Sequence, residues 1–225
     1  MCIRDSYLPA QKIGGDLYDV FEIDTDSIGV AIADVSGKGI PASIVMAMCQ
    51  THLKHLIKQK TSPADILKLL NEELLKTMRP GMFVTLSLGI INSKTNSLTI
   101  ARAGHEAPLF YSPNHKERIF PIEVSGMALG IVPGEIFNEK IEDFTLSFQK
   151  DDILVLYTDG VTEMENKKQV EFSADRLMRI IDKTSSKNAD AIVADIIERL
   201  NDFAEGLEPL DDQTLLLIKH IGKPN

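Results

Sequence analysis

Short apolar segments separated by tight polar turns fill the second half of the chain, and they constrain its fold more than any other feature. The runs FVTLSLGII, LTIARAG, PLFYS, RIFPIEV, FTLSF and DDILVLYTDG follow one another between residues 83 and 160, and QTLLLIKH closes the series at residues 213–220. Each run has the length and composition of a strand. Because short turns join successive strands, we expect mainly antiparallel sheets with helices packed outside them, an α+β fold.

The first half of the chain contains a predicted hairpin and two predicted helices. The segment DLYDVFEIDTDSIGVAIAD, residues 16–34, reads as two strands around a polar turn. A helix follows with Pro41 in its first turn, and a second helix lies within residues 62–78, where Ser62 is the expected N-cap. Two further helices are predicted at 173–182 and 189–203. The apolar row expected to face the core of the first helix has a spacing of four and comprises Ile40, Ile44, Met48, His52 and Leu56, widened by Val45, Cys49 and Leu53.

Composition and charge exclude several classes of function. The 225 residues carry a net charge of -9 and are 44% hydrophobic, which suits one globular domain and disfavours nucleic acid or anionic membrane as a partner. No apolar stretch approaches the length of a membrane span. Two cysteines, Cys2 and Cys49, form neither a disulfide framework nor a metal pair. We therefore expect a cytoplasmic protein.

The two ends of the chain are expected to lie outside the folded domain. The first six residues, MCIRDS, lack periodicity, and the strand-like pattern starts near Tyr7. We interpret residues 1–6 as non-native or linker residues. The domain is then expected to span residues 7–220, with residues 221–225 as a tail.

Aspartates occur at the ends of several predicted strands. Asp34 ends the run GVAIA, Asp159 follows ILVLYT, Asp211 and Asp212 precede QTLLLI, and Asp16 follows IGG. In an antiparallel sheet the end of one strand lies beside the start of its neighbour. The spacing therefore predicts that these carboxylates gather at one edge.

A cluster of carboxylates needs a positive partner, since like charges a few ångströms apart resist common ionisation. Oxygen ligands without Cys or His suit Mg²⁺ or Mn²⁺. Val35 is placed to offer its carbonyl, and glycines at 14, 15, 37 and 160 would let the backbone approach an ion. Taken singly, each aspartate is better explained by turn chemistry. Taken together, the aspartates favour a metal site.

The loop SGKG, residues 36–39, is a possible phosphate-binding loop that fails the usual template. A nucleotide-binding loop requires G-x-x-x-x-G-K-[ST], but Lys38 is followed by Gly39 and lacks the earlier glycine. We interpret Asp34 as the residue of this segment that takes part in the chemistry of the site. The glycines then form the turn before the helix. Lys38 then either faces solvent or meets a substrate.

Seven motifs in a fixed order identify a resemblance that extends from about Pro9 to Lys219. The motifs are GGDLYD, DVSGKGIPAS, FVTLSLG, AGHEAPL, ALGI, DDILVLYTDGVTE and DDQT. Together they resemble the SpoIIE-type, RsbU-like branch of the metal-dependent PPM protein serine/threonine phosphatases. The resemblance implies a two-sheet antiparallel β-sandwich flanked by helices on both sides, in α-β-β-α layers.

The resemblance also implies an activity and a set of site residues. Members hydrolyse phosphoserine or phosphothreonine, typically on a STAS-domain anti-anti-sigma factor in a partner-switching pathway, by attack of a hydroxide that bridges two Mn²⁺ or Mg²⁺ ions. An upstream sensor domain or regulator outside this sequence is expected, and a homodimer is possible. Carried over to this sequence, the metal ligands are Asp16, Asp34, the Val35 carbonyl, Asp159 and Asp211, with Asp212 ranked second to Asp211 and with Asp16 and Asp34 bridging.

Two positions depart from the pattern that the resemblance implies. Ser36 stands where the wider family carries a histidine proposed as general acid, so the proton donor is unassigned. Arg102 replaces the asparagine of the motif NAGH, while His105 of the same motif is interpreted as a structural hydrogen-bonding residue. The alternative function is a catalytically silent module that binds a STAS-type partner.

Overall fold

The computed structural model describes residues 1–10, 13–59 and 62–222, and the chain divides into two compact units. Unit 1 comprises Met1–Gln11, Ala107–Ile122 and Gln149–Asn225, and unit 2 comprises Lys12–Glu106 and Glu123–Phe148. Each unit has an apolar core of its own. The two cores are built from segments that alternate along the sequence, and the assignment of residues 7–220 to one domain stays a prediction.

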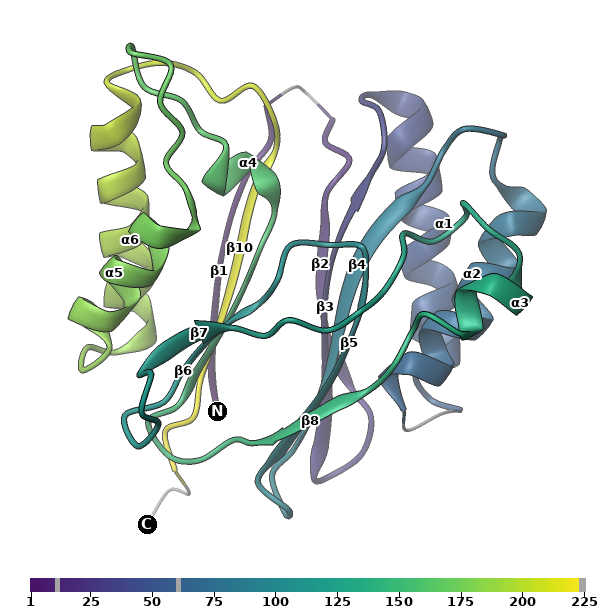
Figure 1. Cartoon of the computed structure of the whole chain (residues 1–225), viewed down its shortest axis with the longest axis horizontal. Helices are drawn as coiled ribbons and strands as arrows, with labels where there is room; N and C mark the ends of the chain where they lie inside the picture. Colours follow the sequence, from purple (N-terminus) through teal and green to yellow (C-terminus); the bar gives the residue numbers. More distant parts are fainter. Residues whose placement is uncertain (11–12, 60–61, 223–225) are drawn as a thin grey trace. The chain divides into compact units, whose positions relative to one another are not determined.

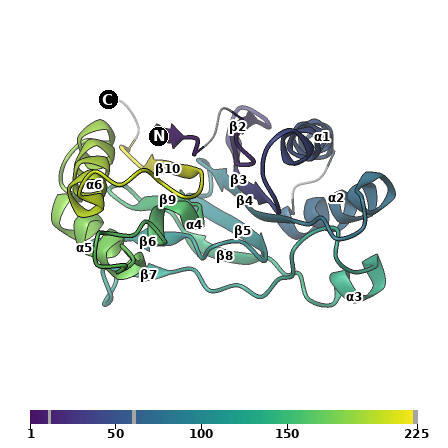
Figure 2. The same ribbon diagram turned by 90° about the horizontal axis from the view of Figure 1, so that it is seen from above.

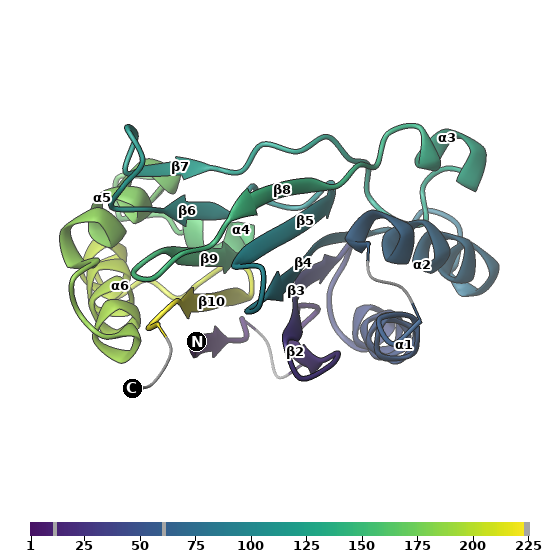
Figure 3. The same ribbon diagram turned by 90° about the horizontal axis from the view of Figure 1, so that it is seen from below.

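Unit 2 contains an antiparallel sheet with helices on one face (Figures 1 and 3). The strand order is β2 (Leu17–Glu22), β3 (Ser27–Val35), β4 (Val84–Asn92), β5 (Ser97–Ala103) and β8 (Phe144–Ser147). Helices α1 (Ile40–Leu56) and α2 (Pro63–Thr77) cover one face, and the short α3 (Gly134–Asn138) lies beside α2. The predicted hairpin is confirmed as β2 and β3, which pair from Leu17↔Ala33 to Glu22↔Ile28.

The start of α2 follows the predicted capping pattern, but the predicted buried face of α1 is wrong in its first half. Ser62 caps α2 by accepting a hydrogen bond from the Asp65 amide at 3.2 Å. In α1, Ile40 and Ile44 are 65% and 56% exposed. A row at spacing four turns by about 40° at each step, so it drifts away from a flat sheet. The side chains of α1 that are buried mix spacings of three and four: Ala42, Val45, Met46, Cys49, Leu53 and Leu56.

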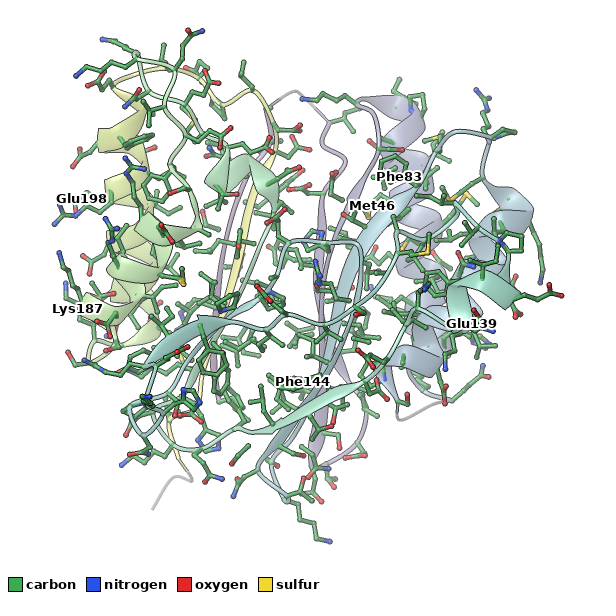
Figure 4. All side chains as sticks on the ribbon, in the orientation of Figure 1. Met46, Phe83, Glu139, Phe144, Lys187 and Glu198 are labelled. Carbon is green, nitrogen blue, oxygen red and sulfur yellow. The ribbon has the colours of Figure 1, made fainter. Side chains whose placement is uncertain are left out.

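Unit 1 contains a second antiparallel sheet, again with its helices on one face (Figure 2). The strand order is β1 (Cys2–Leu8), β10 (Gln213–Lys219), β9 (Ile153–Tyr157), β6 (Leu109–Tyr111) and β7 (Ile119–Pro121). Helices α5 (Ala174–Thr184) and α6 (Ala189–Ala204) confirm the two late helices, and α4 (Asp159–Thr162) is a single turn after β9. Glu198 of α6 points away from the sheet (Figure 4).

The first strand corrects the interpretation of residues 1–6 as lying outside any element. The strand β1 begins at Cys2 and pairs with β10 along its whole length, from Cys2↔Lys219 to Leu8↔Gln213. It is an edge strand on which Arg4, Asp5, Tyr7 and Leu8 are exposed, so it lacks the clean alternation of a half-buried strand. The assignment of residues 1–6 as non-native stays a prediction.

Two antiparallel sheets with separate helices confirm the predicted α+β class. Every helix in the described residues is too short or too polar to span a bilayer.

Candidate metal-binding site

In unit 2, two of the predicted aspartates lie at the same end of the β2–β3 hairpin. Asp16 directly precedes β2, and Asp34 directly follows Ala33, which pairs with Leu17, the first residue of β2. Both residues are half-buried. The strand pairing therefore brings the backbones of Asp16 and Asp34 to one end of the hairpin, and the approach of their carboxylates stays a prediction.

Gly15 brings the backbone close to two oxygen atoms at this end of the hairpin. A Cβ atom placed on Gly15 would lie 3.4 Å from the Val35 carbonyl oxygen and 3.6 Å from Oδ1 of Asp34. Both oxygens thus lie close to the position that a Cβ atom on Gly15 would occupy. Because glycine has no side chain, that position is open. A carbonyl and a carboxylate are the donors that Mg²⁺ and Mn²⁺ prefer, so this end of unit 2 fits a hard cation.

The loops around Asp34 are fastened to their neighbours by hydroxyl groups. Ser43 Oγ, in the first turn of α1, lies 3.1 Å from the Gly14 carbonyl oxygen and 3.0 Å from that of Gly39, and donates to them. Ser36 Oγ accepts from the amide of Phe83, which is labelled in Figure 4, at 2.9 Å, and the Ser36 amide donates to the Phe83 carbonyl at 3.0 Å. Ser36 therefore clamps the loop to the start of β4. Lys38 is exposed in the same loop.

In unit 1, a helical turn and a loop bring Asp159 near Asp211 and Asp212. Asp159 opens α4, and a Cβ atom on its neighbour Gly160 would lie 2.2 Å from the Asp212 carbonyl oxygen and 3.2 Å from the carbonyl carbon of Asp211. Only glycine permits this approach. The fully buried Thr158 donates from Oγ1 to the Asp212 carbonyl at 3.2 Å, and Gln213 Nε2 donates to the Gly160 carbonyl at 3.0 Å.

Asp211 and Asp212 differ in how their side chains are used. Oδ1 of Asp212, which is 7% exposed, accepts a hydrogen bond from the Ala10 amide at 2.8 Å and so ties the end of β1 to the loop before β10. Asp211 is half-buried, and its Oδ1 accepts a hydrogen bond from the Asp212 amide at 2.9 Å. The ranking of Asp211 above Asp212 as a ligand stays a prediction.

His105 and Arg102 lie beside the Asp34 end of β3 within unit 2. His105 is 4% exposed, and its Nδ1 lies 2.9 Å from Oγ1 of Thr85, the residue paired with Asp34 across β3 and β4. Arg102 Nη1 donates to the His105 carbonyl at 2.6 Å. The interpretation of His105 as a structural hydrogen-bonding residue agrees with these contacts. Thr85 itself was missed, although its place in the motif FVTLSLG was the available signal.

The gathering of all four aspartates around a metal stays a prediction. Asp16 and Asp34 belong to unit 2, and Asp159 and Asp211 belong to unit 1. In the part of the chain that the structure describes, no three His, Cys, Asp or Glu side chains already form a group that could hold a metal ion. In each unit a glycine lies next to a predicted ligand: Gly15 near Oδ1 of Asp34 in unit 2, and Gly160 against the backbone of Asp211 and Asp212 in unit 1.

Comparison with known proteins reveals both family and fold. The family model of stage II sporulation protein E (SpoIIE) matches residues 24–221. Phosphoserine phosphatase RsbU of Bacillus subtilis is 32% identical over 215 residues, which cover 94% of this chain and 61% of that protein. The chain thus spans less than two thirds of the length of this relative.

Two solved structures show the same fold at low sequence identity. The SiaA PP2C domain of Pseudomonas aeruginosa is 15% identical with a TM-score of 0.85, covering 96% of this chain and 85% of that chain. RsbX, solved in complex with magnesium, is 20% identical with a TM-score of 0.69, covering 96% and 92%. The predicted PPM-type fold, which is the fold of PP2C domains, is confirmed. Since the family model matches most of the sequence, the chain belongs to the SpoIIE family.

Proposed function

We propose that this protein is a metal-dependent protein serine/threonine phosphatase that hydrolyses phosphoserine or phosphothreonine. The observation that carries the proposal is the end of the β2–β3 hairpin, where Asp34 Oδ1 and the Val35 carbonyl oxygen approach Gly15 next to Asp16, in a chain of the SpoIIE family. The name of the B. subtilis relative, phosphoserine phosphatase RsbU, supports the same reaction. Hydrolysis of phosphate monoesters requires accelerations of up to about 10²¹-fold, so strong stabilisation of charge is needed.

The proposed ligands are oxygen atoms from both units. Asp16 and Asp34 would hold or bridge two Mn²⁺ or Mg²⁺ ions with the Val35 carbonyl, and Asp159 and Asp211 would complete the set. Asp212 would act mainly by fixing the loop, because its carboxylate accepts from the Ala10 amide. The magnesium in the RsbX structure supports a hard divalent cation. When bound, such ions lower the pKa of coordinated water and neutralise charge on the phosphoryl group.

The chain's own residues contribute by holding the ligands before a metal arrives. Ser36 and Ser43 fix the two loops that flank Asp34, and Gly160 packs the turn that begins with Asp159 on the backbone of the loop that contains Asp212. Preset ligands lose little freedom on binding, which favours tight and geometrically selective coordination.

The proposed substrate is a phosphorylated STAS-domain protein in a partner-switching pathway. The likeness to RsbU, a phosphoserine phosphatase, supports this class of substrate. The net charge of -9 is consistent with a protein partner and disfavours nucleic acid. We propose action in the cytoplasm, where two unpaired cysteines, Cys2 and Cys49, are stable as thiols.

The test of the reaction is Mn²⁺-dependent hydrolysis of an aryl phosphate by the wild-type chain. Asp34→Asn should reduce the rate by more than about 100-fold. Loss of a residue that only hydrogen-bonds a metal ligand usually costs about 10–100-fold, and loss of a ligand itself should cost more. Asp26→Asn is the matched control, because Asp26 is exposed directly before the other end of β3. Chelation of the metal should abolish the activity of the wild type and the control alike. Full activity of Asp34→Asn would disprove the proposed site.

The test of the substrate replaces the aryl phosphate with a phosphoserine STAS-domain protein. We expect release of phosphate at a higher kcat/KM, since contacts remote from the reacting phosphate contribute binding energy. Tight binding of that protein without hydrolysis, by a folded and metal-loaded chain, would instead favour the silent binding module.

A further inference from the structure

Arg102 holds together two segments of unit 2 that meet beside the sheet. Its side chain leaves β5, and Nε donates to the Val124 carbonyl at 3.0 Å while Nη1 donates to the His105 carbonyl at 2.6 Å. The planar guanidinium suits such paired contacts better than a lysine ammonium does. Arg102 thereby fixes the backbone of His105 relative to the segment that contains Val124.

The backbone around Arg102 is closely packed at two glycines. Gly104 has a φ of +69°, and a Cβ atom there would lie 2.7 Å from the Ala128 amide nitrogen. A Cβ atom on Gly126 would lie 1.5 Å from the Arg102 carbonyl oxygen. Since both glycines permit backbone contact that no other residue allows, the turn from Arg102 to His105 has one orientation. That turn directs the His105 ring back towards β4.

The His105 ring then meets the residue next to Asp34. Nδ1 of His105 lies 2.9 Å from Thr85 Oγ1, and Thr85 is the cross-strand partner of Asp34. The same hydroxyl points to the Asp34 carbonyl oxygen at 3.5 Å, a weak contact longer than the roughly 3.0 Å that ordinary O–H···O hydrogen bonds reach. One hydroxyl group therefore joins the buried ring to the backbone of a proposed metal ligand. The three strands involved, β3, β4 and β5, lie side by side (Figure 1).

We propose that Arg102, His105 and Thr85 form a positioning chain that orients Asp34 for metal binding. This inference rests on the proposed function, and it adds residues that hold a ligand without touching the metal. Arg102 stands where the resemblance implies asparagine, and its longer side chain bonds two carbonyl oxygens at once. The positioning chain lies wholly within unit 2.

The experiment measures the dissociation constant of Mn²⁺ by calorimetry for the full chain and its variants, well below their melting temperatures. Thr85→Val keeps the branched shape but removes the hydroxyl, and we expect Mn²⁺ to bind about 10-fold more weakly. Thr85→Ser restores the hydroxyl and should bind as the wild type does. Arg102→Lys cannot bond both carbonyl oxygens as the guanidinium does and should weaken binding by a smaller factor.

Two controls separate positioning from a general loss of stability. Thr99→Val removes a hydroxyl of the same sheet, which bonds Thr145 Oγ1 at 2.9 Å, and should leave the Mn²⁺ affinity unchanged. Ile66→Val trims the buried core under α2 and should lower the melting temperature without changing the Mn²⁺ affinity.

The outcomes distinguish this inference from the proposed function. If the wild type binds Mn²⁺, Asp34→Asn does not, and Thr85→Val binds as the wild type does, the positioning chain is disproved and the proposed site stands. Weaker binding by Ile66→Val to the same degree as Thr85→Val would also overturn the inference, because stability alone would explain the loss. A wild type that binds no Mn²⁺ overturns both.

Discussion

In unit 2 the pairing of two adjacent strands brings Asp16 and Asp34 to the same end of a hairpin, whereas in unit 1 the turn that begins with Asp159 packs on the loop that contains Asp211. The first pair depends on sheet register, which many backbone hydrogen bonds fix at once. The second pair depends on one glycine and on a few side-chain hydrogen bonds from Thr158 and Gln213. We therefore expect the position of the aspartates in unit 2 to tolerate substitutions better than the position of those in unit 1. We call the unit 2 aspartates the robust pair and the unit 1 aspartates the fragile pair.

The largest expected effect separates the two neighbouring aspartates of unit 1. Asp211→Asn should reduce Mn²⁺-dependent hydrolysis by more than about 100-fold, since it removes a proposed ligand charge. Asp212→Ala should instead lower the free energy of unfolding by about 1–3 kcal/mol, because the part-buried Ala10 amide loses its acceptor. Rates at saturating Mn²⁺ and urea unfolding check both variants. A larger loss of activity at saturating metal in Asp212→Ala would reverse the ranking.

The second prediction tests the fragile pair through Gly160. Gly160→Ala should lower the free energy of unfolding by about 1–3 kcal/mol and the melting temperature by roughly 2–12 °C, because its Cβ would overlap the Asp212 carbonyl oxygen. Activity should fall with stability, since Asp159 moves with this turn. Calorimetric melting checks the effect, and an unchanged melting temperature would show that the turn relaxes freely.

The third prediction tests the robust pair through Gly15. Gly15→Ala should change stability little, because its Cβ would make only ordinary contacts at 3.4 Å and beyond. It should nevertheless weaken Mn²⁺ binding by about 10-fold, since the new methyl group occupies the space between the Val35 carbonyl and Asp34. Gly134→Ala, at the start of α3 in the same unit, is the matched control and should alter neither property.

The smallest expected effect concerns Asp152, which precedes β9, whereas Asp159 follows the same strand. Asp152 is 2% exposed just before this strand, and burial raises the pKa of its carboxyl group. A raised pKa in the folded state contributes stability that is present at pH below the unfolded pKa and is lost as the pH rises through the folded value. Asp152→Asn should therefore stabilise the protein at pH 7, by about 1 kcal/mol or less.

The pH dependence distinguishes this effect from a simple packing change. The advantage of Asp152→Asn should shrink as the pH falls towards the ordinary aspartate range, where the wild-type carboxyl group is neutral as well. Urea unfolding at pH 7 and pH 4 measures it, with the exposed neighbour Asp151→Asn as control. Activity should be unchanged, and an advantage that is equal at both pH values would contradict the burial explanation.

Much of the fold could be predicted because it depends on local pattern. The short apolar runs of β3 to β5 and the cap at Ser62 are properties of short segments. The exposed face at Ile40 and Ile44 and the edge strand from Cys2 to Leu8 were missed. Their environments are set by partners far away in sequence, and their own patterns are weak.

The candidate site was predicted in part for the same reason. The placement of Asp16 and Asp34 at one end of a hairpin follows from the pairing of β2 with β3, and the sequence predicts that hairpin directly. The tie between Asp212 and Ala10 spans 202 residues, and the contact of Thr85 with His105 depends on a glycine turn and on an arginine that replaces the usual residue. Such contacts form between residues that are far apart in the sequence. A sequence motif identifies the residues involved but does not show which other residues they contact.

The most direct test of the account is the rate of Mn²⁺-dependent phosphate release by the wild type, Asp34→Asn and Asp159→Asn, one variant for each unit. The account predicts that both substitutions reduce the rate by more than about 100-fold while the fold is retained. Retention of full activity by either variant, with the wild type active and metal-dependent, would contradict the claim that both aspartate pairs serve one reaction.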